Sequence, residues 1–348
     1  MSTRIALAGN PNCGKTTMFN AMTGANQYVG NWPGVTVEKK EGKLRGKHKK
    51  EDVVVTDLPG IYSLSPYTLE EVVSRDYLLK ENPDVIVDLV DATNIERNLY
   101  LTTQLLETGI PVVIALNMAD LIKKRGIKID TKRLSMLLDC PVIETSALKS
   151  QGLDALMDEA LAVCAQKDAP MPHEIFSDTL EDAIRQIKTL LPDSIPAHEK
   201  RWYAIKVLEN DSKVMENPAL SAELKAKAES LRKALETDAD SDMESIVTDE
   251  RYGFIQKLVK TTVKKPNTKM TVSDKIDRIV TNRFLGLPIF ALVMIAVYYV
   301  SVTTVGTWVT DWTNDVFVVA VQDFVSGILA GIGVGDIVTG LVVDGVIG

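Results

Sequence analysis

The sequence contains few of the residues that hold disulfide scaffolds or zinc sites together. Among its 348 residues there are three cysteines and three histidines. Three scattered thiols are too few for a disulfide framework or a four-thiolate zinc site. The histidines, His48, His173 and His198, have no metal-ligand spacing. These absences exclude a disulfide-stabilised secreted domain and a structural zinc domain, and they fit a reducing cytosol.

An excess of positive charge is also missing. The formal net charge is -8, from 39 Lys and Arg against 47 Asp and Glu, which argues against a chain that wraps nucleic acid through overall basicity. We therefore expect no nucleic-acid partner. The amino terminus lacks the long apolar stretch of a secretory signal, so we expect this end to lie in the cytosol.

Basic residues are absent from the last part of the chain, after Arg283. Residues 284–310 are 27 consecutive residues without a charge, and as a helix they would extend roughly 40 Å, against about 30 Å for a hydrocarbon core. Lys275, Arg278 and Arg283 precede this run and no positive residue follows it. The positive-inside rule then places residues 1–283 on the cytoplasmic side of the membrane. The alternative is a buried helix of a soluble domain.

Residues 311–348 are apolar too, but Asp323, Asp336 and Asp344 interrupt them. A carboxylate at mid-bilayer costs about 3 kcal/mol, so we do not predict a second independent span. Repeated glycines are typical of a helix that packs on other helices. We expect this segment to begin a membrane domain that the sequence cuts short.

Apolar strand-like runs alternate with helical patterns in the first part of the chain. The expected strands are 5–7, 53–56, 85–90, 112–116 and 142–143, and the expected helices are 70–80, 97–108 and 153–165. This alternation predicts an α/β domain over residues 1–168 with a mostly parallel sheet. Residues 169–270 turn charged and helical and predict a helical bundle, followed by a juxtamembrane segment at 271–283. The basic run 42–50 is interpreted as a hairpin tip, with contact to anionic lipid as the alternative.

A phosphate-binding loop follows the first expected strand. It reads Gly9-Asn10-Pro11-Asn12-Cys13-Gly14-Lys15-Thr16 and leads through Thr17 into a helical run. Glycines let backbone N–H groups converge on phosphate oxygens, a lysine reaches the terminal phosphates, and a hydroxyl can bind magnesium. The strand, loop and helix order therefore predicts a nucleotide site.

Three further motifs follow in the order typical of GTPases. They are Asp57-Leu58-Pro59-Gly60, Asn117-Met118-Ala119-Asp120 and Thr145-Ser146-Ala147, each at the end of an expected strand. Asp57 has the place of the acid that holds magnesium. The last two motifs resemble guanine-reading motifs, in which Asp120 accepts hydrogen bonds from the base, Asn117 braces the loop and the Ala147 N–H meets the base oxygen. Met118 stands where the consensus has Lys, so no ammonium is available there.

The combined strings resemble those of the ferrous-iron transport protein B (FeoB) family. They include the motifs above and the stretch from Val29-Gly30-Asn31-Trp32-Pro33 to Gly34-Val35-Thr36-Val37-Glu38. The resemblance implies a Ras-like P-loop GTPase, a helical domain that acts on nucleotide retention, and entry into a first membrane helix at about residue 284. It also implies Fe²⁺ as the transported ion, a permease domain beyond this chain, and small cytosolic Feo proteins as partners.

The resemblance also assigns ligands and catalytic groups. Thr16, Thr36 and Asp57 are expected to hold Mg²⁺, and Gly34, Val35, Val37 and Glu38 to border the nucleotide. Lys15, Thr36, Gly60 and Asn12 are the expected catalytic residues. Ile61 replaces the glutamine that orients water in Ras-like enzymes, so intrinsic hydrolysis should be slow. Related potassium-activated GTPases suggest K⁺ at Asn12, with backbone carbonyls of Gly30, Asn31 and Trp32.

The sequence thus predicts a membrane-tethered part of a prokaryotic ferrous-iron transporter that binds and hydrolyses GTP. Two alternatives stay open. One is a soluble potassium-dependent GTPase acting in ribosome or RNA maturation, and the other is a lipid-surface module that does not turn nucleotide over.

Overall fold

The computed structural model describes residues 2–24, 27–48, 52–166, 174–265, 276–277, 279–333 and 335–347. The chain divides into two compact units, Met1–Pro266 and Asn267–Gly348. His173, Lys275 and Arg278 lie outside the described residues, as do the expected domain boundaries at 168 and 270. Those boundaries therefore stay predictions.

A seven-stranded, mostly parallel sheet forms the centre of the first unit, as the α/β prediction requires. Its strand order is β2-β3-β4-β1-β5-β6-β8. All five strands that the sequence predicts are present and pair in parallel: β1 (Thr3–Gly9), β4 (Val53–Asp57), β5 (Val85–Asp91), β6 (Val112–Asn117) and β8 (Val142–Glu144). Their nearly continuous apolar runs are typical of strands buried on both faces.

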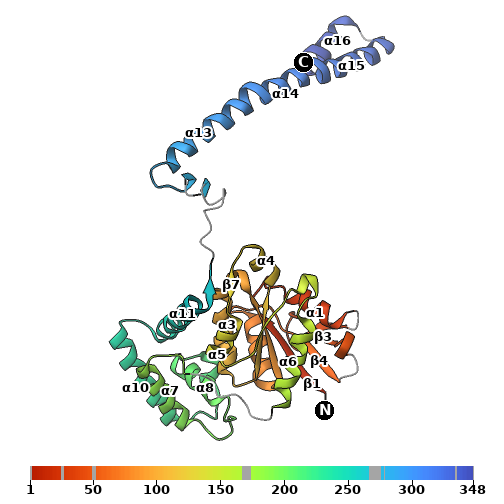
Figure 1. Cartoon of the computed structure of the whole chain (residues 1–348). Helices are drawn as coiled ribbons and strands as arrows, with labels where there is room; N and C mark the ends of the chain where they lie inside the picture. Colours follow the sequence, from red (N-terminus) through yellow and green to blue (C-terminus); the bar gives the residue numbers. More distant parts are fainter. Residues whose placement is uncertain are drawn as a thin grey trace. The chain divides into compact units, whose positions relative to one another are not determined.

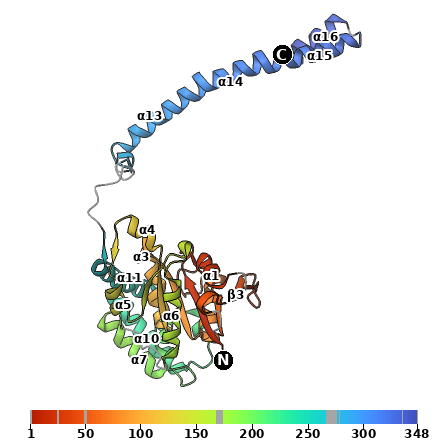
Figure 2. The same cartoon turned by 45° about the vertical axis from the view of Figure 1, so that its right-hand side comes forward.

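Helices cover both faces of this sheet, and Figures 1 and 2 show the layers from two directions. One core lies under α1 (Lys15–Thr23) and α6 (Leu153–Ala165). The opposite core lies under α2 (Leu69–Asp76), η2 (Tyr77–Glu81), α3 (Ile95–Glu107) and α5 (Thr131–Leu138). The expected helices at 70–80, 97–108 and 153–165 are therefore confirmed. Short segments complete the domain: η3 (Ala92–Asn94), α4 (Ala119–Lys124) and η4 (Ala147–Lys149).

Two strands were not predicted. β2 (Gln27–Asn31) and β3 (Glu38–Lys43) pair antiparallel at the edge of the sheet, and β3 continues antiparallel onto β4. Both strands are only partly buried, so they lack the apolar pattern that marks a strand covered on both faces.

The basic run lies between β3 and β4 and contains η1 (Gly46–His48), in agreement with the hairpin interpretation. Its described cations have partners within the protein. Lys47 Nζ lies 2.7 Å from an Asp158 oxygen, Lys43 Nζ lies 3.4 Å from Asp52, and Arg45 donates to the Ala21 carbonyl at 2.7 Å. These contacts pair Lys43, Arg45 and Lys47 within the protein, and contact of the run with anionic lipid stays an alternative.

The second half of the first unit is a helical bundle, as predicted. It comprises α7 (Asp178–Leu190), α8 (Lys200–Leu208), α9 (Ser212–Met215), α10 (Ala222–Ala239) and α11 (Met243–Thr262). Side chains of Ser177, Asp211, Ser221 and Asp242 cap the amino ends of α7, α9, α10 and α11. Pro192, Pro196 and Pro218 lie between these helices, and Trp202 is buried in the bundle core.

The bundle is joined to the sheet domain by buried contacts. Helix α11 carries Ile255, Leu258 and Val259 into the core beneath α3 and α5. Its end continues into β9 (Val263–Lys264), which pairs antiparallel with β7 (Lys128–Ile129). The helical bundle therefore folds as one unit with the sheet domain.

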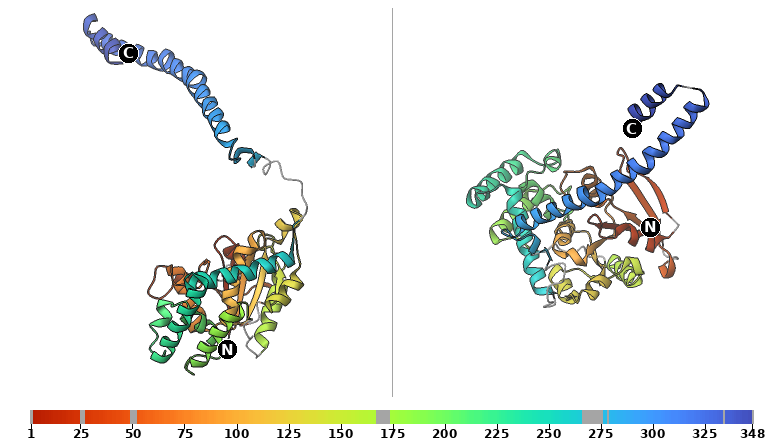
Figure 3. Two further views of the ribbon diagram at one scale, coloured as in Figure 1. Left: turned by 90° about the vertical axis from the view of Figure 1, so that its left-hand side faces the viewer. Right: turned by 90° about the horizontal axis from the view of Figure 1, so that it is seen from above.

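The second unit contains one helix from Gly286 to Gly331, 46 residues that are long and apolar enough to cross a membrane by length and composition. It runs through α13 (Gly286–Tyr299), η5 (Val300–Gly306), α14 (Thr307–Trp312), η6 (Thr313–Val318) and α15 (Val319–Gly331) (Figure 3). The helix therefore continues beyond the charge-free run at 284–310. Then α16 (Asp336–Val342) and η7 (Val343–Ile347) turn back, and Gln322 Nε2 donates to the Val343 carbonyl at 3.2 Å.

Candidate nucleotide-binding site

The phosphate-loop residues surround a cavity of about 510 Å³ at the carboxyl end of β1. It is lined by Asn10, Pro11, Asn12, Gly14, Lys15, Thr16, Thr17 and Gly60. Gly14 has a φ of 94° in the left-handed region, and a Cβ there would lie 2.5 Å from Asn117 Nδ2. Only glycine fits this position, which lies at the amino end of α1, where backbone N–H groups can face an anion.

Lys15 and Asp57 form an ion pair beside this cavity. Lys15 Nζ lies 2.5 Å from Asp57 Oδ1, and the two side chains are 11% and 7% exposed. Burial raises the pKa of Asp57, and the nearby Lys15 ammonium opposes that rise. The pair brings the predicted phosphate-binding cation and the predicted magnesium acid within direct contact.

Thr36, the other expected magnesium ligand, is solvent-exposed and does not line the phosphate cavity. It belongs to a turn in which the Trp32 N–H donates to the Val37 carbonyl at 2.9 Å and the Val35 N–H donates to the Trp32 carbonyl at 3.2 Å. Gly34, with a φ of 78°, permits this turn. Within the described residues, the segment from Gly34 to Glu38 contributes no lining to the phosphate cavity.

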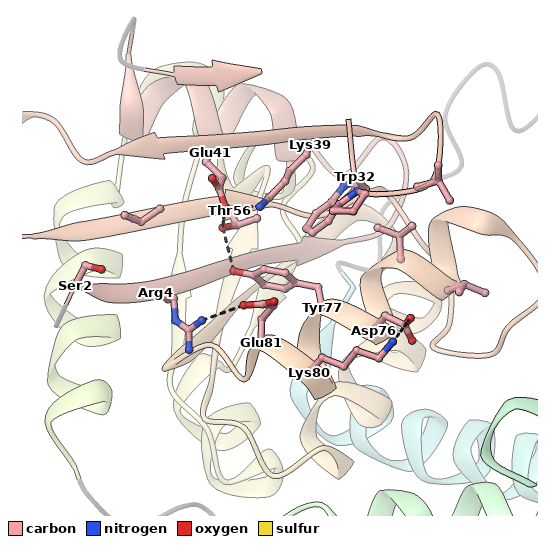
Figure 4. A pocket seen from close by; sticks show the side chains of 15 residues that line it. Ser2, Arg4, Trp32, Lys39, Glu41, Thr56, Asp76, Tyr77, Lys80 and Glu81 are labelled. Carbon is pink, nitrogen blue, oxygen red and sulfur yellow. Dashed lines mark hydrogen bonds and ion pairs between the residues drawn. The ribbon is translucent and has the colours of Figure 1, made fainter. Parts of the chain in front are cut away.

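Trp32 instead lies in a second pocket of about 450 Å³, between the sheet and α2–η2 (Figure 4). Its ring lies edge-on to Tyr77, with centroids 5.3 Å apart, and Lys39 Nζ lies 5.0 Å from the ring centre. Tyr77 in turn donates to the Thr56 hydroxyl at 3.0 Å. Gly30 and Asn31 belong to β2, away from the phosphate-cavity lining, so of the expected potassium ligands only Asn12 borders that cavity.

The two base-reading motifs meet at the ends of β6 and β8. Asn117 bridges them to the phosphate loop, since its Nδ2 donates to the Cys13 carbonyl at 2.8 Å and its Oδ1 accepts from the Ala147 N–H at 3.0 Å. The Ala119 N–H donates to the Thr145 carbonyl at 3.1 Å. The sequence predicts that Asn117 braces the base-side loop and that the Ala147 N–H meets the base oxygen. In the structure this N–H donates to Asn117, so the group expected to meet the base is bonded within the protein.

Asp120 has two partners that sequence reasoning did not identify. The Ser146 hydroxyl donates to Asp120 Oδ1 at 3.0 Å, and Lys149 Nζ lies 3.1 Å from Oδ2. Hydrogen bonds from Lys149 and Ser146 lower the pKa of Asp120. The sequence points to a role for Lys149 only indirectly, because Met118 stands at the position where the guanine-reading motif usually has a lysine.

The residues present fit a nucleotide and a hard divalent cation. The glycine-shaped loop and Lys15 provide donors for phosphate, while the Thr16 hydroxyl and the Asp57 carboxylate are oxygen ligands of the kind Mg²⁺ prefers. Cys13 belongs to the same loop but is buried, and burial raises the pKa of its thiol to about 12. It therefore serves through its backbone rather than as a nucleophile.

Two protein families match consecutive parts of the chain. The family described as "Ferrous iron transport protein B" matches residues 3–160, and the "FeoB cytosolic helical domain" matches residues 176–264. The second match covers all of α7 to α11.

Curated relatives extend the similarity toward the end of the chain. A Porphyromonas gingivalis protein named as a fusion of Fe(2+) transport protein A and Fe(2+) transporter FeoB is 42% identical over 324 residues, covering 89% of this chain and 38% of that protein. The Escherichia coli K12 Fe(2+) transporter FeoB is 37% identical over 309 residues, covering 87% of this chain and 39% of the relative. The chain thus spans about two fifths of the length of these relatives.

Solved structures match the first unit. An S. thermophilus NFeoB variant bound to mGDP is 49% identical with a TM-score of 0.72, and the match covers 75% of this chain and all of that one. The mGMPPNP-bound NFeoB from S. thermophilus is 48% identical with a TM-score of 0.66, covering 77% of this chain and all of that one.

Proposed function

The chain belongs to the ferrous iron transport protein B family, and from this premise we propose that its sheet domain binds and hydrolyses GTP to regulate a ferrous-iron transporter. Similar solved structures carry mGDP and mGMPPNP, which supports a guanine-nucleotide site here. The observation that carries the proposal is Asn117, whose side chain joins the phosphate loop at Cys13 to the base-reading loop at Ala147. One residue thus fixes the distance between the phosphate and base subsites.

The chain's own residues account for binding and slow hydrolysis. With nucleotide bound, Lys15 would pair with the terminal phosphates instead of Asp57, and Asp57 would hold Mg²⁺ together with Thr16 and Thr36. Bound magnesium would neutralise charge on the phosphate oxygens. Ile61 is buried at 2% exposure and follows Gly60 where other GTPases present a polar side chain. Water is therefore not oriented by that position.

Side-chain contacts with the sheet domain support a coupling role for the helical bundle. Lys206 Nζ lies 3.4 Å from the Ser65 hydroxyl, in the segment that follows Gly60, and Arg75 of α2 lies 2.9 Å from Asp211. The Tyr67 hydroxyl also contacts Glu244 of α11. A change at the nucleotide is thereby transmitted to the bundle.

The wider function follows from the relatives' names. Relatives named as Fe(2+) transporters extend beyond this chain, which supports Fe²⁺ as the substrate and a permease domain in the whole protein. Small cytosolic Feo proteins are part of the proposal as partners. The Gly286–Gly331 helix crosses the bacterial inner membrane in this proposal, with residues 1–283 in the cytoplasm. The alternative of a soluble GTPase in ribosome or RNA maturation is not favoured, because both family matches and the long apolar helix go against it.

The Asp120→Asn variant tests the base assignment. Because an amide donates where the carboxylate accepted, we expect the preference to shift from guanine to xanthine nucleotides, with GTP affinity lower by roughly tenfold or more. Competition binding with GDP, XDP and ADP measures this. Unchanged GDP affinity in Asp120→Asn would contradict the assignment, whereas loss of both GDP and XDP binding would indicate misfolding.

Single-turnover hydrolysis should be faster in potassium than in sodium at equal ionic strength. Asn12 borders the phosphate cavity with an uncharged oxygen donor, so it is the proposed ligand. The potassium-dependent increase in hydrolysis rate should be well below the increase that an arginine finger gives, which is roughly 10³-fold or more. The Asn12→Ala variant should lose the difference between the two salts while keeping nucleotide affinity. Equal stimulation of both proteins would remove Asn12 from this role.

Reporter fusions test the membrane orientation. A reporter after Ser273 should give a cytosolic signal, because Lys275, Arg278 and Arg283 hold that side in the cytoplasm. A reporter after Gly331, where the long helix ends, should report the far side. Cytosolic signals from both fusions would rule out the span.

A further inference from the structure

A lysine from outside the recognised motifs contacts the base-reading carboxylate. Lys149 Nζ lies 3.1 Å from Asp120 Oδ2, while the Ser146 hydroxyl holds Oδ1 at 3.0 Å. The Asp120 side chain is 14% exposed and that of Lys149 is 43% exposed. Each carboxylate oxygen therefore has one partner in the protein, and each can still accept a hydrogen bond from a ligand.

The turn that carries Lys149 is closed by its own backbone. The Lys149 N–H donates to the Ser146 carbonyl at 3.1 Å, and the Ser150 N–H donates to the Ala147 carbonyl at 3.2 Å. Ser146 and Gln151 form a β-bridge across the base of the turn. The same turn carries the Ala147 N–H, which donates a hydrogen bond to Asn117 Oδ1. Lys149 is therefore anchored to the loop that reads the base rather than to a separate surface segment.

The opposite loop lacks a cation of its own. Met118 has a φ of 62° and precedes α4, and its thioether cannot form an ion pair with Asp120. Lys123, one turn further along α4, is paired with Glu144 at 2.8 Å instead. Lys149 is thus the lysine that the structure places on Asp120.

We propose that Lys149 is a positioning residue for guanine recognition. It fixes the orientation of the Asp120 carboxylate, so that this carboxylate can accept hydrogen bonds from both N–H groups of the base. The proposal rests on the proposed function, since it concerns the same base subsite. A carboxylate held at both oxygens loses less rotational freedom when a base binds, so its hydrogen bonds form at lower entropic cost. Lys149 would act on affinity and base choice, and not on the phosphates.

The test measures mant-GDP affinity of the full chain in detergent micelles. We expect Lys149→Ala to weaken GDP binding roughly three- to fivefold, as for removal of a partly exposed ion pair, and Lys149→Arg to retain the parent affinity. Single-turnover hydrolysis at saturating GTP should be unchanged in Lys149→Ala. Lys123→Ala is the matched control, because it removes a neighbouring lysine and its ion pair without touching Asp120.

A double-mutant cycle assigns the effect to the carboxylate. In the Asp120→Asn background, Lys149→Ala should change XDP affinity less than it changes GDP affinity in the parent. Equal GDP affinity in Lys149→Ala and Lys123→Ala would overturn the proposal, as would tighter binding in Lys149→Ala, which would make the lysine a competitor for Asp120. Failure of the parent to bind GDP would instead contradict the proposed function.

Discussion

Lys15→Ala should reduce affinity for GTP and GDP by roughly 10²- to 10⁴-fold and abolish measurable hydrolysis. In the structure Lys15 borders the phosphate cavity and has one close anionic partner, Asp57 at 2.5 Å. Each hydrogen bond to a charged group contributes about 1.5–3 kcal/mol, so losing a lysine that bridges two phosphates should cost two such bonds. Isothermal titration with GDP and GTP measures the loss directly.

The same substitution leaves Asp57 without its cation. Asp57 is 7% exposed and burial already raises its pKa, so removing the ammonium should raise that pKa further. Thermal unfolding without nucleotide therefore has to accompany the titration. Lys43→Ala is a suitable control, because Lys43 is 69% exposed and its pair with Asp52 lies outside the cavity. Its nucleotide affinity should equal that of the parent.

The consequence for transport requires cells that carry the complete gene. Iron uptake should be lost with Lys15→Ala and retained with Lys43→Ala, provided both proteins reach the membrane in equal amounts. Normal uptake by a Lys15→Ala protein that no longer binds GTP would separate transport from the nucleotide site. Retained GTP binding by Lys15→Ala would instead contradict the phosphate-site assignment.

The buried parallel strands were readable in the sequence because burial on both faces leaves a nearly unbroken apolar signal. β5 is buried along its whole length from Val85 to Asp91, and β6 is buried from Val112 to Asn117. The motif residues followed from these strands, since parallel strands present their carboxyl ends at one edge. Asn117 therefore reaches both Cys13 and Ala147, although 104 and 30 residues separate them.

Features set by tertiary contacts were not readable. β2 is the edge strand and β3 lies between it and β4, and both are only partly buried, so their pairing depends on tertiary contacts and not on a local pattern. Trp32 belongs to the stretch predicted to bind potassium, but its ring packs against Tyr77. Packing of a large aromatic side chain decides where that segment lies, and periodicity cannot report it. The pairing of Lys149 with Asp120 likewise joins two loops that meet only in the folded sheet.

Arg251→Met should lower the unfolding midpoint of the first unit by about 10 °C. Arg251 is 1% exposed and lies between two domains, with Nη2 at 2.7 Å from Glu107 of α3 and Nη1 at 3.6 Å from Glu209. Methionine keeps much of the apolar stem but leaves the Glu107 carboxylate, 3% exposed, without its cation. Removing one partner of a buried ion pair lowers the free energy of unfolding by about 3–5 kcal/mol. In a domain of about 200 residues, each kcal/mol lowers the unfolding midpoint by about 2–4 °C.

Two further variants distinguish an uncompensated charge from lost packing. Arg185→Met removes an arginine that is 50% exposed and paired with Glu174 at 2.9 Å, so it should shift the midpoint by no more than about 2 °C. Adding Glu107→Leu to Arg251→Met removes the stranded carboxylate and should restore part of the loss. Glu209 still has Lys206 at 2.6 Å, so the double variant keeps that end of the network paired. No recovery in the double variant would show that Arg251 stabilises the junction of α3 and α11 mainly through packing of its side chain against Tyr100 and Phe176.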